Sequence, residues 1–281
     1  MTTRRGGLFG ANPVVLSLGA GLLLLLGLLG VGEAQAQTAR TLQENADPVR
    51  IDSVVSLNTT YVFRGNLQYS DEEIPSLQLN LNSDYFVGRR GFVWGWLWAG
   101  TALDERETNA ELGSRDEFDL GGGYGYWLRK DMELRLGGIA YLRPENTPTD
   151  IREEVVGTLT WVVYDDQDIQ FVPYARVYGE VHRMLGVYGE AGFDVVRWLG
   201  FGFYLRGNLT GGASTYYRDN VEDFNAFSFQ VELAYNFISD WTVSGQFNGA
   251  VTNDVTEIST DFLEKYGTFW SGLKLRYSPR F

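Results

Sequence analysis

The sequence of 281 residues contains no cysteine and only one histidine. Without cysteine the chain can form neither a disulfide framework nor a thiolate metal site, and a catalytic cysteine is excluded. An enzymatic function that needs histidine would have to use His182, and no serine or acidic residue is placed by the sequence to partner it. We therefore expect a protein that is not an enzyme and that uses no metal or other cofactor.

Positive charge is also in short supply. Lys and Arg number 23 against 36 Asp and Glu, which gives a formal net charge of -13. A polyanion is poorly attracted to so acidic a chain. We therefore expect no nucleic-acid partner.

The sequence has few prolines and methionines, 7 and 3, but 34 glycines and 15% aromatic residues. This composition is typical of a sheet-rich chain with glycine where strands crowd or bend. The mean hydropathy of -0.17 is too polar for a helical membrane protein. This mean hydropathy is compatible with a β-barrel, because only alternate residues of its strands face lipid.

The one long apolar run lies near the N-terminus, over residues 14–31, after Arg4 and Arg5. It is followed by Ala34, Gln35 and Ala36, a small-x-small pattern that signal peptidase cleaves. We expect a signal peptide over residues 1–36, with export and cleavage near Ala36. The run exceeds the usual signal core of ~7–15 residues, so an uncleaved helix that anchors a periplasmic domain is the alternative.

After a short polar periplasmic lead over residues 37–52, the pattern changes to period two and keeps it to residue 281. The clearest example is residues 227–237, where Phe227, Val231 and Leu233 alternate with Ser228 and Glu232. An alternation of this kind places apolar side chains on one face of a strand and polar ones on the other. The sequence predicts an all-β fold, a transmembrane antiparallel up-and-down β-barrel of about 12 strands, and about 10 or 14 also fit.

The predicted connections alternate between tight turns and long polar loops, as expected for periplasmic turns and outer loops. The exception is the short link over residues 181–184. Four tryptophans fall at the tight-turn end, where we expect an aromatic girdle at the membrane interface: Trp127, Trp161, Trp198 and Trp241. Trp94, Trp96 and Trp98 form a separate group. The residues between them are not polar, so alternation does not assign a polar face to this strand, and we expect the tryptophans to face lipid.

The last thirteen residues, 269–281, resemble the closing strand of bacterial outer-membrane barrels, which the barrel assembly machinery reads. The residues that match this assembly signal are Gly272, Leu275, Tyr277 and Phe281. Lipid offers no partner for an open sheet edge, so we expect this strand to pair with the first one.

Two stretches are similar to the TorF-type porin family of proteobacterial outer membranes. The first is Thr60-Tyr61-Val62-Phe63-Arg64-Gly65 with Gln68 and the following strands, which include Phe92 and Trp94; the second includes Asp119 to Tyr124, Tyr141 to Pro144 and Glu153 to Val155. The resemblance implies an outer-membrane barrel with a pore. It implies no catalytic residue.

Charged residues recur on the polar face of the predicted strands. Ionisable groups at membrane depth are costly unless they line water or pair with each other. The candidates for the lumen are Arg64, Glu117, Asp119, Glu133, Arg135, Glu190, Asp194, Arg206, Glu232, Lys274 and Arg276. They predict an aqueous, charge-lined channel, or else a plugged lumen in which they neutralise one another. Asp71, Glu72 and Glu73 in the first outer loop would add negative charge at the mouth.

Two other patterns have plainer explanations than a binding site. The run Gly121-Gly122-Gly123-Tyr124-Gly125 lacks the lysine and the helix of a phosphate-binding loop, and we expect tight packing or a bend in a strand. Asp165, Asp166 and Asp168 lack the twelve-residue pattern of a calcium loop, and we expect an acidic turn.

The sequence therefore predicts an outer-membrane channel for small polar solutes or ions, with outer-membrane lipid and the barrel assembly machinery as partners. The alternative is a non-conducting outer-membrane scaffold or surface interaction protein.

Overall fold

The computed structural model describes residues 48–60, 62–63, 66–67, 74–103, 116–143, 150–166, 168–181, 186–215, 224–254 and 267–279. The chain divides into two units, residues 1–33 and 34–281, and every described residue belongs to the second. Among the described residues, no helix has the length and apolar character needed to cross a membrane. The candidates Arg64, Asp71, Glu72, Glu73 and Phe281, together with His182, lie outside the described residues.

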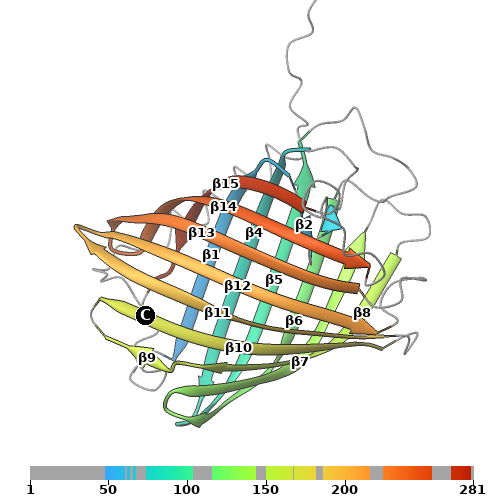
Figure 1. Cartoon of the computed structure of the whole chain (residues 1–281). Coiled ribbons are helices and arrows are strands. Elements are labelled where there is room, and N and C mark those ends of the chain that lie inside the picture. The colour runs from blue at the N-terminus through green and yellow to red at the C-terminus, as the bar shows by residue number, and fades with distance from the viewer. Residues whose placement is uncertain are drawn as a thin grey trace, which may run out of the picture. The chain divides into compact units, whose positions relative to one another are not determined.

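The second unit is built on antiparallel strands that follow one another around a closed sheet (Figure 1). The strands of this sheet are β1 (Val49–Asn58), β4 (Ser76–Val87), β5 (Gly91–Ala102), β6 (Asp116–Arg129), β7 (Met132–Arg143), β8 (Asp150–Trp161), β10 (Ile169–Glu180), β11 (Val187–Gly200), β12 (Phe203–Thr215), β13 (Phe224–Ile238), β14 (Trp241–Asp254) and β15 (Gly267–Tyr277). Sequential neighbours pair throughout, and β15 pairs with β1. The predicted 12-stranded up-and-down barrel is confirmed.

The closing contact joins the two ends of the sheet. β1 and β15 run antiparallel from Ser53 opposite Tyr277 to Asn58 opposite Gly272. Because every barrel strand has a partner on both sides, no edge is left with unpaired backbone groups. The first strand begins at Val49, whereas the sequence placed the start of the barrel at residue 53; residues 49–52 already pair with β4.

Three short strands in the described part of the chain lie outside the ring. β2 (Val62–Phe63) and β3 (Asn66–Leu67) pair only with each other. β9 (Tyr164–Asp165) pairs with β10 beside the turn that follows β8. In that turn Asp166 Oδ1 accepts the backbone N–H groups of Asp168 and Ile169, at 2.8 Å each, which are the hydrogen bonds of an acidic turn.

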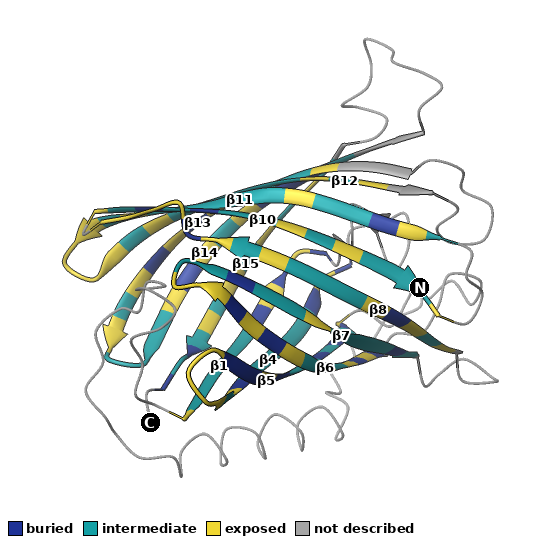
Figure 2. Cartoon of the chain, turned by 90° about the horizontal axis from the view of Figure 1, so that it is seen from below, coloured by how far each residue is buried: buried dark blue, intermediate teal, exposed yellow. Residues whose placement is uncertain are grey.

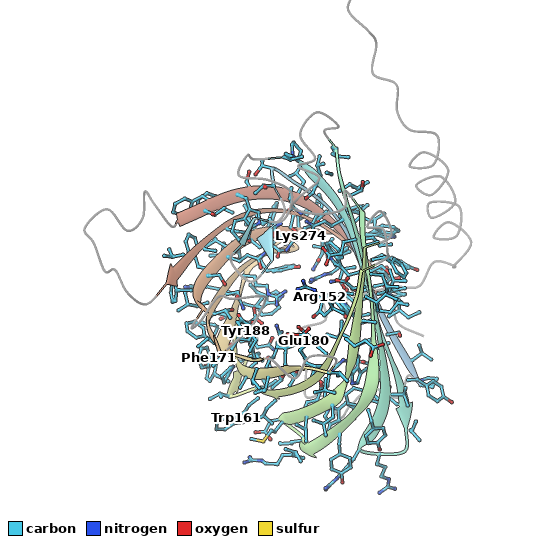
Figure 3. The ribbon with its side chains drawn as sticks, turned by 90° about the vertical axis from the view of Figure 1, so that its right-hand side faces the viewer. Arg152, Trp161, Phe171, Glu180, Tyr188 and Lys274 are labelled. Carbon is cyan, nitrogen blue, oxygen red and sulfur yellow. The ribbon has the colours of Figure 1, made fainter. Side chains whose placement is uncertain are left out.

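Burial alternates along the strands, as Figure 2 shows. On β13 the large side chains Val231 and Leu233 are exposed, whereas Glu232 between them is 2% exposed. Figure 3 shows which face is internal: Lys274, Arg152, Glu180 and Tyr188 project into the barrel, while Trp161 points away from it. The outer face is therefore the apolar one, and the polar face is enclosed.

The register contradicts the expectation that Trp94, Trp96 and Trp98 face lipid. Ser56 pairs with Lys274 and Gln78 with Ser56. Gly100 pairs with Gln78, so the even-numbered residues of β5 share the inner face. Trp94 and Trp98 are each 8% exposed, whereas Val93, between Phe92 and Trp94 in the sequence, is 49% exposed. The prediction was wrong because both faces of this strand are apolar, so alternation alone could not assign them.

The inward tryptophans fit because glycines face them. A Cβ at Gly125 would overlap the ring of Phe92, one at Gly137 would overlap Trp94, and one at Gly121 would lie 3.1 Å from Trp96. The glycine run of β6 thus provides the space in which the aromatic rings of β5 lie against the wall. The expected role of this run, tight packing in a strand, is what the structure shows.

The predicted tryptophan girdle is only half present. Trp161 and Trp241 lie on the outer face, and the Trp241 ring is tilted against that of Tyr277, with ring centres 4.6 Å apart. Trp127 instead lies inside the barrel, where it is 6% exposed and donates Nε1–H to Glu133 Oε2 at 3.2 Å. Trp198 shares a face with Asp194, four residues earlier on the same strand, and that face is also internal.

Candidate functional site: the inner wall of the barrel

All the predicted lumen residues that the structure describes lie on the inner face. The register of successive strands places these ten side chains on that face: Glu117, Asp119, Glu133, Arg135, Glu190, Asp194, Arg206, Glu232, Lys274 and Arg276. Four of these carboxylates are almost fully buried, with exposed fractions of 6% for Glu117, 2% for Asp119, 5% for Glu133 and 2% for Glu232. Burial of this degree requires ionic or hydrogen-bonding partners.

One half of the inner wall carries ion pairs between neighbouring or next-neighbouring strands. Arg176 of β10 lies 2.9 Å from Glu190, and Arg206 lies 3.0 Å from Asp194. Lys274 of β15 reaches Glu232 of β13 at 3.3 Å. These pairs join strands that are close in the sheet. They therefore link neighbouring parts of the wall and do not cross the lumen.

A second group of charges lies on the opposite part of the wall. Arg135 of β7 donates both terminal nitrogens to Asp84 of β4, at 2.9 and 3.1 Å, and also pairs with Glu133. Its guanidinium lies 4.9 Å from the ring centre of Phe92, and Arg50 lies 3.5 Å from Asp84. This cluster ties four strands together over an aromatic surface.

That aromatic surface is part of an apolar cluster inside the barrel. Its buried members come from β5, from the end of β6 and from the β8–β10 region: Phe92, Trp94, Trp127, Val162 and Val172. Phe86 joins it, stacked on Trp127 with ring centres 5.4 Å apart. The cluster lies at the tight-turn end of these strands.

The wall formed by β14, β15, β1, β4 and β5 also carries six inward carboxamides: Asn58, Gln78, Asn80, Asn82, Gln246 and Asn248. Gln246 of β14 donates to Asn58 of β1 at 2.7 Å, across the intervening strand β15. The residue of β15 between them is Gly272, where a Cβ would overlap Asn58 Oδ1 and lie 3.0 Å from Gln246 Nε2. A glycine predicted as part of the assembly signal thus also makes room for an amide bridge.

The other two described residues of the predicted assembly signal lie on the outer face. Leu275 is 37% exposed there, and Tyr277 is 5% exposed because Trp241 covers it. Recognition by the assembly machinery stays a prediction.

The sequence analysis missed several inner-wall charges. They share a face with residues that it did name: Arg50, Asp52, Asp84, Arg152, Glu154, Arg176 and Glu180. Strand parity could have found them, since each lies an even number of positions from a polar inward neighbour. With these included, carboxylates outnumber cations on the described inner wall. No group of three His, Cys, Asp or Glu side chains in this part of the chain is arranged to hold a metal ion.

The fold and the two-faced wall define a closed barrel of the outer-membrane type, and solved structures share that fold. An outer-membrane channel from Pseudomonas putida F1 aligns with 87% of this chain and 100% of its own, at a TM-score of 0.52 and 12% identity. The NanC porin aligns with 82% of this chain and 100% of its own, at a TM-score of 0.48 and 11% identity. The CymD monoaromatic hydrocarbon channel aligns with 91% of this chain and 96% of its own, at a TM-score of 0.46 and 10% identity.

The match to the Pseudomonas putida channel, at 12% identity, shows a shared fold and no more. No protein-family profile matches the chain. No curated protein sequence matches it either. The resemblance to TorF-type porins therefore stays a prediction.

Proposed function

We propose that the protein is a channel for small polar solutes or ions across the bacterial outer membrane. The observation that carries this proposal is the closed barrel with an apolar outer face and an inner face of charged and amide side chains. A barrel filled as a structural core would have no need of so many ionisable groups at membrane depth. Ionisable groups in this position are suited to line a water-filled channel.

Export and membrane insertion belong to the same proposal. The N-terminal signal and the closing strand support passage to the outer membrane, with lipid and the barrel assembly machinery as partners. We expect N-terminal sequencing of the mature protein to begin near Gln37 and the protein to fractionate with outer membranes. Recovery of an uncleaved chain in the inner membrane would contradict this expectation.

The proposed selectivity is for small cations or weakly charged solutes. Carboxylates outnumber cations on the described inner wall, and Asp71, Glu72 and Glu73 add negative charge in the first outer loop. Negative charge at a low-dielectric rim concentrates cations where they enter.

Single-channel recording in planar bilayers tests the proposal directly. The refolded mature barrel should give discrete conductance steps. A matched preparation that lacks the closing strand, residues 267–281, should give none, because it cannot close the sheet. A folded, heat-modifiable barrel with no conductance would overturn the proposal.

The second candidate is a non-conducting scaffold or surface interaction protein. The internal apolar cluster and the paired arginines favour it, because both reduce the open cross-section. The two functions differ in one measurement, since only the channel passes current when folded.

A further inference from the structure

A recess of about 290 Å³ lies on the inner wall, between β14 and β5. Six of the side chains that line it are carboxamides: Asn58, Gln78, Asn80, Asn82, Gln246 and Asn248. Two tryptophans, Trp98 and Trp270, border the same space. Its volume is just below the ~300–1,000 Å³ range of small-molecule sites, so it would hold a small ligand.

The amides are held in place before any ligand arrives. Asn82 donates to Asn80 at 2.7 Å, and Gln246 donates to Asn58 at 2.7 Å. Asn58 in turn donates to Ser56 Oγ at 3.2 Å. A primary amide has two N–H donors and two acceptor lone pairs, so one that is fixed through one of them still has others to offer. A fixed row of such groups can bind a ligand with little loss of side-chain entropy.

Carboxamides suit a particular ligand chemistry. A hydroxyl group both donates and accepts hydrogen bonds, and a carboxamide offers both functions on one side chain. The tryptophans add flat apolar surfaces: Trp98 lies against the wall over Gly100, and Trp270 is half-buried on β15. A ligand with hydroxyl groups on its edge and an apolar C–H face would use both kinds of surface.

The charges of the recess indicate that this ligand is neutral. Its two cations already have acidic partners, Lys274 with Glu232 at 3.3 Å and Arg276 with Asp52 at 3.4 Å. An anionic ligand would have to compete with carboxylates fixed in the wall, and a cationic one with the ammonium and guanidinium groups. A neutral polar ligand meets neither repulsion.

We propose that this recess is a binding site for a neutral, hydroxyl-rich solute of the size of a mono- or disaccharide. The proposal deepens the proposed function, on which it rests for its biological role, by giving a chemical class to the solute. The site lies along the wall and leaves the charged pairs of β10–β13 outside it. A solute bound there would be held on the way through the barrel.

Isothermal titration calorimetry on the refolded full-length mature barrel in detergent tests the site without requiring conduction. The probes are glucose, maltose and sucrose, with glucuronate and glucosamine as charged comparators. We expect saturable binding of at least one neutral sugar, with a Kd at least tenfold lower than for either charged sugar. Asn80→Ala and Trp270→Ala should each weaken that binding tenfold or more.

Asn208→Ala is the matched control, because Asn208 is an inner-wall amide of β12 outside the recess. It should change the Kd by less than twofold, and heat-modifiability on gels verifies that each variant folds. If a variant at 80 or 270 fails to fold, Gln78→Ala takes its place. No saturable binding of a neutral sugar, tighter binding of a charged one, or equal loss in Asn80→Ala and Asn208→Ala would overturn the proposal.

Bilayer recording separates this failure from failure of the proposed function. A barrel that conducts ions but shows no sugar binding keeps the channel and removes the site. A barrel that binds maltose but carries no current keeps the site and removes the channel.

Discussion

At the scale of single residues, the inward glycines and the inward aromatic rings form one system. Two of the clearest pairs join neighbouring strands, Phe92 over Gly125 and Tyr188 over Gly212, and a third, Trp94 over Gly137, reaches across β6 from β5 to β7. Several outward glycines have open space instead, and a Cβ at Gly207 or Gly245 meets no atom within 4 Å. Glycine therefore has a packing role on the inner face that it does not have at these outer positions.

We predict that Gly137→Ala lowers the free energy of unfolding by about 1–3 kcal/mol. The new methyl group would overlap the backbone oxygen of Gly122 as well as the Trp94 ring, and a backbone atom cannot move away cheaply. Gly207→Ala is the control and should change stability by less than about 0.5 kcal/mol. Urea unfolding in lipid vesicles measures both, and equal values would contradict the packing role.

A second residue-scale prediction concerns Glu232 and Lys274. The Glu232 side chain is 3% exposed and that of Lys274 is 18% exposed, so removing the cation leaves a buried carboxylate without its nearest counter-charge. We expect Lys274→Met to lower the free energy of unfolding by about 2 kcal/mol. Adding Glu232→Gln should restore at least half of that loss, since the buried carboxylate charge is then removed as well. No recovery in the double variant would mean that Lys274 acts through packing alone.

At the scale of elements, β15 contributes to three functions at once. Its outer face carries Leu275 and Tyr277, and its inner face carries Lys274. Its backbone closes the ring with β1. The strand is therefore essential to the barrel whether or not its terminus is read as a signal.

The signal itself is tested at the terminal residue. Deleting Phe281 removes no described pairing of β15, which ends at Tyr277. If the terminus is recognised during assembly, the deletion should reduce the yield of heat-modifiable barrel in cells several-fold. Deleting one residue from the loop over 104–115 is the control and should leave the yield unchanged. Equal yields would show that the chain end is not a signal.

At the scale of the whole molecule, charge decides which ions the proposed channel would prefer. Under a salt gradient we expect the reversal potential to show cation preference. The preference should weaken near 1 M salt, where the Debye length falls to about 3 Å. Neutralising Asp71, Glu72 and Glu73 to Asn, Gln and Gln should reduce it. Anion preference, or no change on neutralisation, would show that the mouth charges do not set selectivity.

Local alternation was enough to predict much of this molecule. In the run from Phe227 to Phe237 the sequence alone shows which residues share a face, because successive side chains of a strand point to opposite sides. Repeated along the chain, the pattern predicted the strands, the closed ring and the polar inner wall. The ten described lumen candidates share one face for this reason.

The facing of Trp94, Trp96 and Trp98 needed the register, which places Gly123 opposite Trp94, Gly121 opposite Trp96 and Asp119 opposite Trp98. The same holds for contacts between distant segments. Arg135 and Asp84 are 51 positions apart, and Gln246 and Asn58 are 188 apart. Period two is a property of neighbouring residues, whereas pairing across strands depends on register and curvature, and only the closed barrel brings those side chains together.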